Sequence, residues 1–387
     1  MENVWIAGPA RTPIGSHGGK LSSVSAPQLG RFSVHATLER TGITPDQVDE
    51  VIFGNVLSAG LGQNVARQVS LGAGMPDSVP ATTVNKVCGS GLKSVMMAAQ
   101  AIRCEDAHIV IAGGTENMTR APHVTPTVLN PRREPKGEPI DVMIRDGLWD
   151  VYNDVHMGTC GDRCAEKYGL TREAQDDFAA ASYERALSAR KSGHLAREII
   201  DVVTEAGFVT NDEEPDRFDE EKLRGLRPAF GEKGTVTAAN ASSINDGAAS
   251  VAVLSDRGLD NSGAPVSAKI LGYTTAAREP AWFTLAPILA IAGLLEQTGM
   301  TIDDIDLFEI NEAFSCVPMA TMAELSIPHD RVNVFGGAVA LGHPIGASGC
   351  RILVTLLNAM EIRGAKVGIA SLCIGGGEAV AMAVKQT

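Results

Sequence analysis

Apolar and polar positions along the chain form short strand-like runs and longer helix-like stretches, and the same arrangement of the two occurs twice. The segments 108–112 and 367–372 each predict a buried strand, because each is a short continuous apolar run followed by glycines. Each strand follows a helix-like stretch that opens with small residues, 89–91 (Gly-Ser-Gly) in the first case and 347–349 (Ala-Ser-Gly) in the second. The two openings are 258 residues apart.

A second internal match has almost the same offset. The segment 41–49 (Thr-Gly-Ile-Thr-Pro-Asp-Gln-Val-Asp) reappears 257 residues later as 298–306 (Thr-Gly-Met-Thr-Ile-Asp-Asp-Ile-Asp), and each copy lies between a helix pattern and a strand pattern. Two matches at nearly equal offsets predict a duplicated α/β unit. Within each unit, alternating strands and helices predict a mostly parallel sheet covered by helices on both faces.

The segment 121–244 interrupts this pattern. Its start is rich in proline, at Pro122, Pro126, Pro131, Pro135 and Pro139. Further on, Thr171 is a good N-cap for a helix with acidic residues in its first turn, and 212–216 is an acidic run. This segment is too long for a connection. We therefore predict an inserted loop domain at 121–244, between an N-terminal half at 1–120 (completed by about 245–265) and a C-terminal half at 266–387.

Composition narrows the class of protein. The chain has 387 residues, of which 44% are hydrophobic and 20% charged, as in ordinary globular proteins. Its net charge of −13 argues against a nucleic-acid partner. The N-terminus does not resemble a signal peptide, and no continuous apolar run is long enough for a membrane span. We therefore expect a cytoplasmic location, with the seven cysteines as free or functional thiols. Glycine is in excess, with 41 residues.

Cys88 is the first candidate for chemistry, because it lies between an extended run and the helix-like stretch 92–103. The dipole and the free N–H groups of a helix N-terminus favour a thiolate at such a position. The small residues at 89–91 leave room for a ligand to approach closely. The alternative is a buried cysteine in a tight strand-to-helix turn.

His343 holds the equivalent position in the second unit, within the glycine-rich segment 336–349. A purely structural histidine is the alternative. Because duplicated units should place equivalent helix N-termini at related positions, we expect Cys88 and His343 to converge on one cleft. Cys373 and Asn311 each lie at the end of a predicted strand, where α/β sheets gather their ligands.

A metal site is a further alternative. His156, Cys160 and Cys164 are spaced four residues apart and could share one helical face. No fourth ligand is evident, so we expect no metal.

Taken together, these motifs resemble the thiolase family over essentially the whole chain. The matching stretches are 85–91 (Asn-Lys-Val-Cys-Gly-Ser-Gly), 311–314 (Asn-Glu-Ala-Phe), 342–349 (Gly-His-Pro-Ile-Gly-Ala-Ser-Gly), 373–377 (Cys-Ile-Gly-Gly-Gly) and the pantetheine loop 239–249. The resemblance implies the thiolase fold, in which duplicated βαβαβ-type units form a layered α-β-α-β-α core with an inserted loop domain.

The resemblance also implies a reaction. It is closest to the short-chain biosynthetic thiolases, which interconvert two acetyl-CoA with acetoacetyl-CoA and CoA. Cys88 would carry the acetyl group, His343 would activate it, and Cys373 would act as acid and base. His343 with a water held by Asn311 would form one oxyanion site, and the N–H groups of Cys88 and Gly375 the other. The coenzyme A thioester is the substrate, and no cofactor is expected.

The family's substrate contacts can also be matched. Ser242 corresponds to the serine that contacts the pantetheine, and His156 and Met157 border the acyl pocket and pantetheine. The remaining pocket residues would be Leu148, Ala313 and Phe314. A core role stays open for Leu148 and Met157.

Departures from the family pattern leave alternatives. Phe-Thr-Leu-Ala-Pro at 283–287 replaces the usual Met-Gly-x-Gly-Pro beside the acyl pocket, so a thiolase for longer 3-ketoacyl-CoA remains possible. Cys-Gly-Asp at 160–162 replaces Thr-Ala-Glu, and Arg217 is not a clean match for an arginine near the CoA nucleotide. A non-catalytic acyl-CoA-binding protein and a Cys-His-Asn hydrolase are further alternatives. By resemblance, we expect a homodimer or homotetramer.

Overall fold

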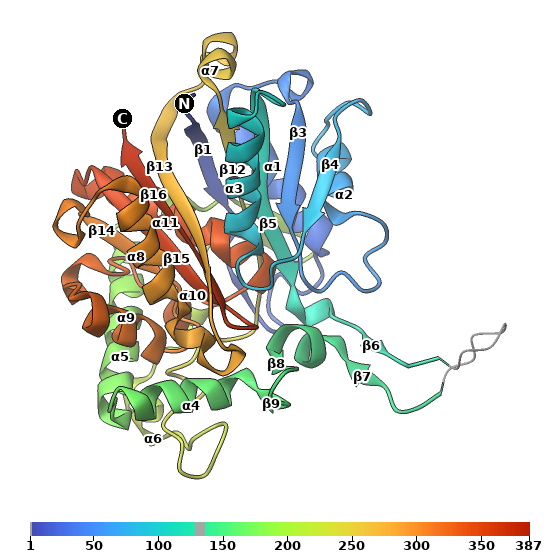
Figure 1. Cartoon of the computed structure of the whole chain (residues 1–387). Coiled ribbons are helices and arrows are strands. Elements are labelled where there is room, and N and C mark those ends of the chain that lie inside the picture. Colours follow the sequence, from blue (N-terminus) through green and yellow to red (C-terminus); the bar gives the residue numbers. More distant parts are fainter. Residues whose placement is uncertain (1, 128–135) are drawn as a thin grey trace.

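One large mixed sheet forms the centre of the fold (Figure 1). The structure is a computed structural model, and it describes residues 2–127 and 136–387. Across the sheet, the strands are β14 (Leu307–Ile310), β15 (Val367–Ile374), β16 (Glu378–Gln386), β13 (Val266–Ala277), β1 (Trp5–Arg11), β12 (Asn245–Leu254), β5 (Ile109–Asn117), β3 (Glu50–Gly54) and β4 (Ala81–Val84), with the short β2 (Gly15–Ser16) paired to β12. The predicted strands at 108–112 and 367–372 correspond to β5 and β15.

The prediction of a mostly parallel sheet is wrong. Strand β3 is parallel to β4 and β5, and β14 is parallel to β15, but the other neighbours along the sheet are antiparallel. The glycine-rich turn at 375–377 explains part of the difference, because Gly376 and Gly377 have φ angles of 91° and 94° and return β16 alongside β15 as a hairpin. Parallel pairing is therefore confined to the two ends of the sheet.

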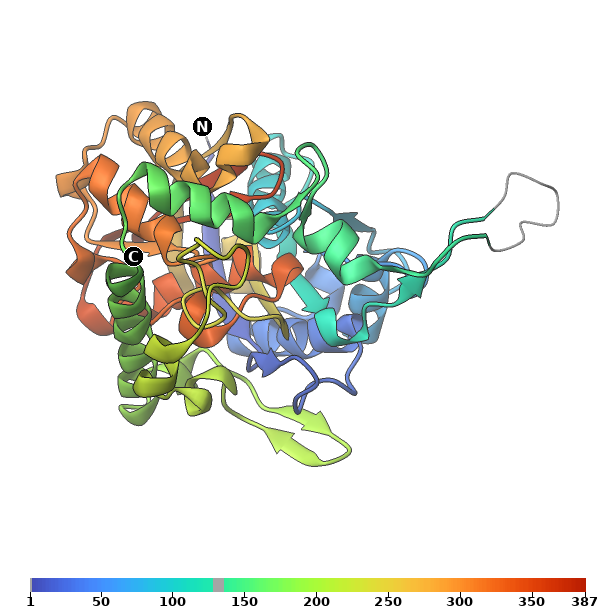
Figure 2. The ribbon, with the colours of Figure 1, turned by 90° about the horizontal axis from the view of Figure 1, so that it is seen from below.

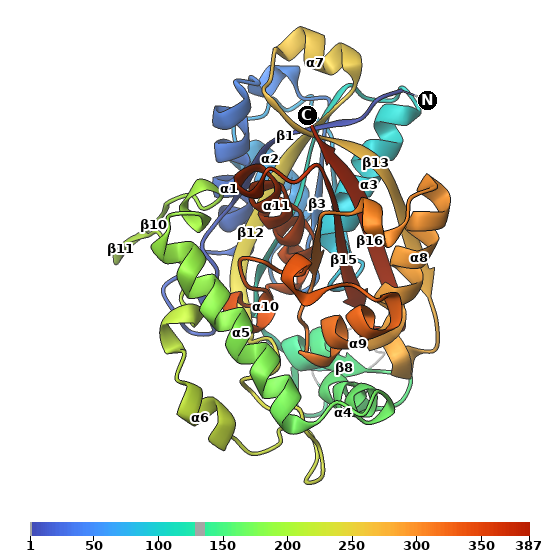
Figure 3. The same cartoon turned by 90° about the vertical axis from the view of Figure 1, so that its left-hand side faces the viewer.

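Helices complete five layers. Their bounds are α1 (Ala26–Thr41), α2 (Val65–Gly72), α3 (Ser90–Arg103), α4 (Met157–Lys167), α5 (Arg172–Lys191), α6 (Glu220–Gly225), α7 (Asp256–Ser262), α8 (Ala286–Thr298), α9 (Cys316–Leu325), α10 (Ala338–Leu341) and α11 (Ile345–Arg363). Helices α3 and α11 pack against each other and against strands of both halves of the sheet. Helices α1 and α8 cover opposite outer sides (Figure 3). The predicted α-β-α-β-α layering is confirmed, with the two β layers joined where β1 pairs with β13.

The internal repeat is visible in side-chain contacts. Asp49 Oδ2 accepts hydrogen bonds from the N–H groups that open β5, at 2.7 and 2.9 Å. Asp306 Oδ2 accepts the equivalent pair at the start of β15, again at 2.7 and 2.9 Å. Thr44 and Thr301 likewise open equivalent short helical turns with capping boxes. These contacts confirm the duplicated unit.

Within its described residues, the segment 121–244 supplies α4, α5, α6 and three small hairpins, which are β6 (His123–Val124) with β7 (Ile140–Asp141), β8 (Trp149–Asp150) with β9 (Val155–His156), and β10 (Val202–Thr204) with β11 (Gly207–Val209). The helix predicted at Thr171 is α5, and the Thr171 hydroxyl accepts from the Ala174 N–H. Figure 2 shows the β6–β7 and β10–β11 hairpins projecting from the body. Pro131 and Pro135 lie outside the described residues.

Among the described residues, two helical stretches are long and apolar enough to cross a membrane by length and composition, Pro280–Thr298 and Ile345–Arg363, and 44% and 89% of their apolar windows are buried inside the protein. Helix α11 is apolar because it packs at the centre of the layers.

Candidate active site

The N-termini of α3 and α11 touch through their backbones, because glycines occupy the contact. A Cβ atom on Gly91 would lie 2.7 Å from a backbone atom of α11, and one on Gly349 would lie 2.3 Å from a backbone atom of α3. A larger residue at either position would force the helices apart. Cys88 precedes α3 and His343 precedes α11, so this contact brings both side chains to one cavity, as the duplication predicted.

Cys88 is buried, with 6% of its surface exposed. It follows Val87, whose φ of 47° is unusual for a β-branched residue. Burial raises the pKa of the Cys88 thiol to about 11, although hydrogen bonds from the N–H groups of Gly375 and of Cys88 itself act in the opposite direction. The expected lowering of this pKa at a helix N-terminus is therefore wrong, because loss of solvation outweighs the backbone donors.

His343 is fixed by its neighbours. Its backbone N–H donates to Asn245 Oδ1 at 2.8 Å, and its Nδ1 lies 2.5 Å from Ser348 Oγ. The Ser348 hydroxyl donates to the Pro344 carbonyl at 2.9 Å, so its oxygen can accept a hydrogen bond from Nδ1–H. In that arrangement Nε2 carries the free lone pair, and no described protein atom hydrogen-bonds to it. Burial, followed by the charge of Arg351, lowers the pKa of His343 to about 3.

Cys373 and Asn311 lie at the ends of adjacent parallel strands, as their positions in the sequence predicted. Burial raises the pKa of the Cys373 thiol well above its usual value, and the nearby Cys88 adds to the shift. The Asn311 N–H extends the ladder by donating to the Ser371 carbonyl at 3.0 Å, but the side-chain amide has no hydrogen-bond partner among the described residues. A buried amide in this state is available to hold water or substrate.

Gly375 lies where a side chain would block the site. A Cβ atom there would be 2.3 Å from Met157 Cε and 3.7 Å from a side-chain carbon of Val87. The absence of a side chain lets the Gly375 N–H reach the sulfur of Cys88.

A cavity of about 600 Å³ opens at Cys88 and His343. All six predicted substrate-contacting residues line it: Leu148, His156, Met157, Ser242, Ala313 and Phe314. Asn311, Cys373 and Gly375 are not part of its lining, and they lie at or just after the C-terminal ends of β14 and β15. Phe283, from the segment that departs from the family pattern, also faces the cavity.

The inserted segment holds several lining residues in place. Ser242 donates its hydroxyl and its backbone N–H to the Ala313 carbonyl, at 3.1 and 3.0 Å. His156 caps α4 by accepting the Gly158 N–H at Nδ1, and its ring stacks on Phe230 with centroids 4.6 Å apart. Burial lowers the pKa of His156.

The three candidate metal ligands, His156, Cys160 and Cys164, are directed to different partners and share no common centre. The Cys160 thiol is directed at Asp150 and the Cys164 thiol at the Cys316 carbonyl, while His156 caps its own helix. Within 2–127 and 136–387, no group of three metal-ligating side chains comes together.

Two cationic residues at the cavity are absent from the predicted site, since the sequence offers Arg217 only as an imperfect match to the family's CoA arginine and gives no sign of Lys222. Arg217 and Lys222 both line it, and Arg217 pairs with Glu214 at 3.3 Å while most of its side chain is exposed. Arg217 directly follows the acidic run at 212–216 and Lys222 lies in α6, so neither charge pattern nor helix periodicity pointed to them. Their position gives a chain of net charge −13 a local attraction for an anionic ligand.

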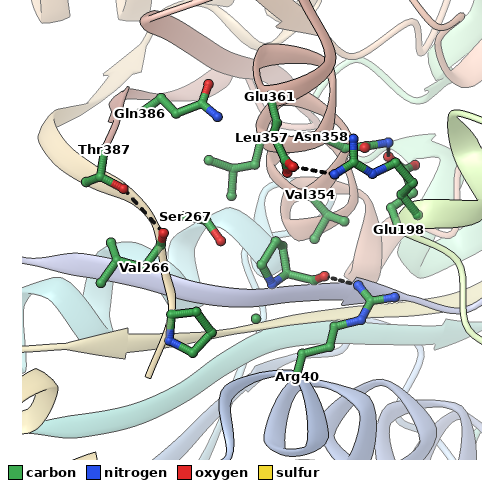
Figure 4. A pocket seen from close by; sticks show the side chains of 14 residues that line it. Arg40, Glu198, Val266, Ser267, Val354, Leu357, Asn358, Glu361, Gln386 and Thr387 are labelled. Carbon is green, nitrogen blue, oxygen red and sulfur yellow. Dashed lines mark hydrogen bonds and ion pairs between the residues drawn. The ribbon is translucent and has the colours of Figure 1, made fainter. Parts of the chain in front are cut away.

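A second cavity, of about 470 Å³, lies beside the C-terminal part of α11 (Figure 4). Arg40, Glu198, Asn358 and Glu361 face it, and the Arg40 guanidinium donates to the Pro9 carbonyl. None of the predicted site residues lines this cavity.

Comparisons with known proteins identify the family. The family model for the thiolase N-terminal domain matches residues 4–257, and the model for the thiolase C-terminal domain matches residues 264–386. The chain is 49% identical to an acetyl-CoA acetyltransferase of Cupriavidus necator over the full length of both, and 48% identical to acetyl-CoA acetyltransferase 2 of Arabidopsis thaliana over 99% of this chain and 97% of the relative. A crystal structure of Acat5 thiolase from Ascaris suum in complex with coenzyme A superposes with a TM-score of 0.95, at 43% identity and full coverage of both chains. This chain belongs to the thiolase family.

Proposed function

We propose that this protein is an acetyl-CoA acetyltransferase that condenses two acetyl-CoA to acetoacetyl-CoA and CoA, reversibly, through an acetyl group on Cys88. The observation that carries the proposal is the meeting of Cys88 and His343 in one cavity, with Cys373 near enough to Cys88 for the two thiols to influence each other. Full-length relatives named acetyl-CoA acetyltransferase support the same reaction.

In the first half-reaction, the Cys88 sulfur attacks the thioester carbonyl of acetyl-CoA as its proton moves to Nε2 of His343. Burial keeps His343 neutral at pH 7, so the lone pair on Nε2 is free to take this proton. The CoA thiolate then leaves and takes a proton from Cys373. The products are acetyl-Cys88, protonated His343, the Cys373 thiolate and free CoA.

The two N–H groups directed at the Cys88 sulfur belong to Cys88 and Gly375. A carbonyl oxygen of acetyl-Cys88 would lie beside that sulfur, so the same donors would stabilise the negative charge that forms there. One oxyanion-hole donor contributes about 3–4 kcal/mol to lowering a barrier.

In the second half-reaction, the Cys373 thiolate removes a proton from the methyl group of the second acetyl-CoA. The resulting carbanion attacks acetyl-Cys88, and the Cys88 thiolate leaves and recovers its proton from His343. Every group returns to its starting protonation state. We assign the thioester oxygen of this second substrate to His343 Nε2–H and to a water held by Asn311, whose amide is unengaged by protein.

Ser242, His156 and Met157 would border the pantetheine, and Arg217 and Lys222 would attract the phosphates of CoA. A thiolase for longer acyl chains is the second candidate. Phe283 disfavours it, because this bulky side chain lines the cavity, is only 3% exposed and packs edge-on against Phe314.

Two other classes fit the site less well. In a Cys-His-Asn hydrolase the asparagine orients the histidine, but here Ser348 is the partner of His343 Nδ1. A non-catalytic binding protein would not need Cys88, His343, Asn311 and Cys373 together in this geometry.

Acetylation of the two cysteine variants tests the proposal. With acetyl-CoA, the native protein is expected to gain one acetyl group on Cys88, seen by mass spectrometry. Cys373→Ala should still be acetylated but fail to form or cleave the carbon–carbon bond. Full activity of Cys88→Ser, or loss of acetylation in Cys373→Ala, contradicts the assigned roles.

For assembly, we propose a homodimer or homotetramer. The projecting β6–β7 hairpin and the edge strand β4 offer surfaces for a second copy (Figure 2). Light scattering at several concentrations tests this proposal, and a monomer at all of them contradicts it.

A further inference from the structure

Helix α11 carries a buried polar stripe that continues from His343. Its members are Ser348, Arg351, Thr355 and Asn358, at most 7% exposed. Spacings of three and four residues place them on one side of the helix. Thr355 and Asn358 both donate to the Glu198 carboxylate, at 2.9 and 2.7 Å, and Ser348 contacts His343. Arg351, in the middle of the stripe, differs from the others because its side chain makes no hydrogen bond within the described residues.

The guanidinium of Arg351 is 2% exposed, yet none of its nitrogens hydrogen-bonds to a described protein atom. Its nearest carboxylate oxygen is Glu309 Oε2, at 3.6 Å, and both Glu309 oxygens also lack hydrogen-bond partners within the described residues. By contrast, buried Arg11 makes direct bonds of 2.6 to 2.9 Å to Glu198 and Asp212. A buried ion pair held apart in this way costs stability unless other polar groups complete it.

Asn311 faces the same space. Glu309 and Asn311 are two residues apart on and just beyond β14, so their side chains point to the same side of the strand, toward α11. Both polar atoms of the Asn311 amide lack protein partners, as does Nε2 of His343. Four buried side chains with unsatisfied polar atoms therefore lie on or next to β14 and α11, two elements that pack against each other. Buried water is the usual partner of such groups.

We propose that Arg351 and Glu309 are positioning residues for the second-substrate oxyanion site, and that they act through shared buried water to fix the orientation of the Asn311 amide. The guanidinium can only donate hydrogen bonds and the carboxylate mainly accepts them, so water between them accepts from Arg351 and donates to Glu309. The hydrogen-bond direction of this water selects whether the oxygen or the NH₂ group of the Asn311 amide faces the substrate. The inference rests on the proposed thiolase function.

This role predicts that the two half-reactions respond differently. Removal of a methyl proton from acetyl-CoA depends on the His343 and Asn311 oxyanion site, whereas acetylation of Cys88 depends on the N–H groups of Cys88 and Gly375. The charge of Arg351 contributes to lowering the pKa of His343, so loss of that charge should not weaken His343 as a base.

The experiment measures both half-reactions in Arg351→Met, Arg351→Lys and Glu309→Gln. Acetylation is followed as the burst of CoA release, and enolate formation as deuterium uptake into the methyl group of acetyl-CoA in D₂O. We expect deuterium uptake to fall about 10- to 100-fold in Arg351→Met and Glu309→Gln, as is typical when a supporting polar contact is lost, while the acetylation burst stays within threefold of the native rate. Arg351→Lys should recover part of the uptake.

Thr355→Val is the matched control, because it removes a buried polar group from the same stripe one turn further from the site. It should leave the ratio of the two half-reactions unchanged. If Arg351→Met does not fold, Glu309→Gln carries the test, since it keeps the size and two polar atoms of the side chain. Equal losses in both half-reactions, or no loss, overturn the inference. Absence of both half-reactions in the native protein instead overturns the proposed function.

Discussion

The Nδ1 atom of His343 lies 2.5 Å from the hydroxyl oxygen of Ser348, one turn into the helix that His343 precedes. Because that hydroxyl is also bonded to the Pro344 carbonyl, it holds the ring with Nε2 toward the cavity.

Removing the hydroxyl should slow the first half-reaction. In Ser348→Ala, we expect the rate of Cys88 acetylation to fall about 10- to 100-fold, since an outer hydrogen-bond partner that fixes a histidine tautomer typically has this effect. Rapid-quench measurement of CoA release gives the rate. Ser33→Ala is the control, because Ser33 is also buried and bonded to a helix carbonyl but lies in α1. A native burst rate in Ser348→Ala would exclude the orienting role.

Alkylation of Cys88 should depend steeply on pH in the substrate-free protein. With a pKa of about 11, the thiolate fraction at pH 7 is on the order of 10⁻⁴, and it rises roughly tenfold per pH unit until the pKa is reached. Peptide mapping after iodoacetamide treatment between pH 7 and 10 measures the rate at Cys88, with exposed Cys104 as an internal reference. A flat profile at Cys88 would show that its thiolate already forms at neutral pH.

Chain length should be set by Phe283. We expect the native enzyme to cleave C4 3-ketoacyl-CoA faster than C8–C16 substrates, and Phe283→Ala to raise the C8-to-C4 ratio of kcat/KM about tenfold or more, because a pocket enlarged by several methylene groups gains contacts with the longer chain. Phe178→Ala, which also removes a buried phenyl ring but in α5, should leave the ratio unchanged. A native preference for C8–C16 would contradict the short-chain assignment.

The backbone contact between α3 and α11 makes Gly91 intolerant of a side chain. Gly91→Ala should lower the free energy of unfolding by about 3 kcal/mol, at the upper end for overpacking, because its Cβ would meet backbone that cannot rotate away. Gly293→Ala in α8, where nothing lies within 4 Å, should instead raise it by about 0.5–1 kcal/mol. Urea titrations of both variants measure the difference, and equal midpoints would rule out the close contact.

Much of the site was predictable because the internal repeat can be recognised in the sequence. Two equivalent helix openings implied that Cys88 and His343 meet, and strand ends implied the positions of Asn311 and Cys373. The pairing directions in the sheet were not predictable in the same way, since a hairpin such as β15–β16 depends on a glycine turn whose geometry the apolar pattern does not encode.

Burial also escaped prediction. A helix N-terminus suggested a lowered pKa for Cys88, but how much solvent the inserted segment excludes is known only once the chain is folded. The positions of Arg217 and Lys222 at the cavity likewise depend on how that segment folds.

The glycine contact between α3 and α11 fixes the relative position of Cys88 and His343 but leaves the side chains around the cavity free to vary. The spacing of nucleophile and base is a property of two touching main chains, so exchanging side chains around the cavity leaves it intact. Leu148, Met157 and Phe230 belong instead to the inserted segment, and Phe283 to a short stretch of its own. New acyl preferences can therefore arise at these positions while the bond-making chemistry is inherited unaltered.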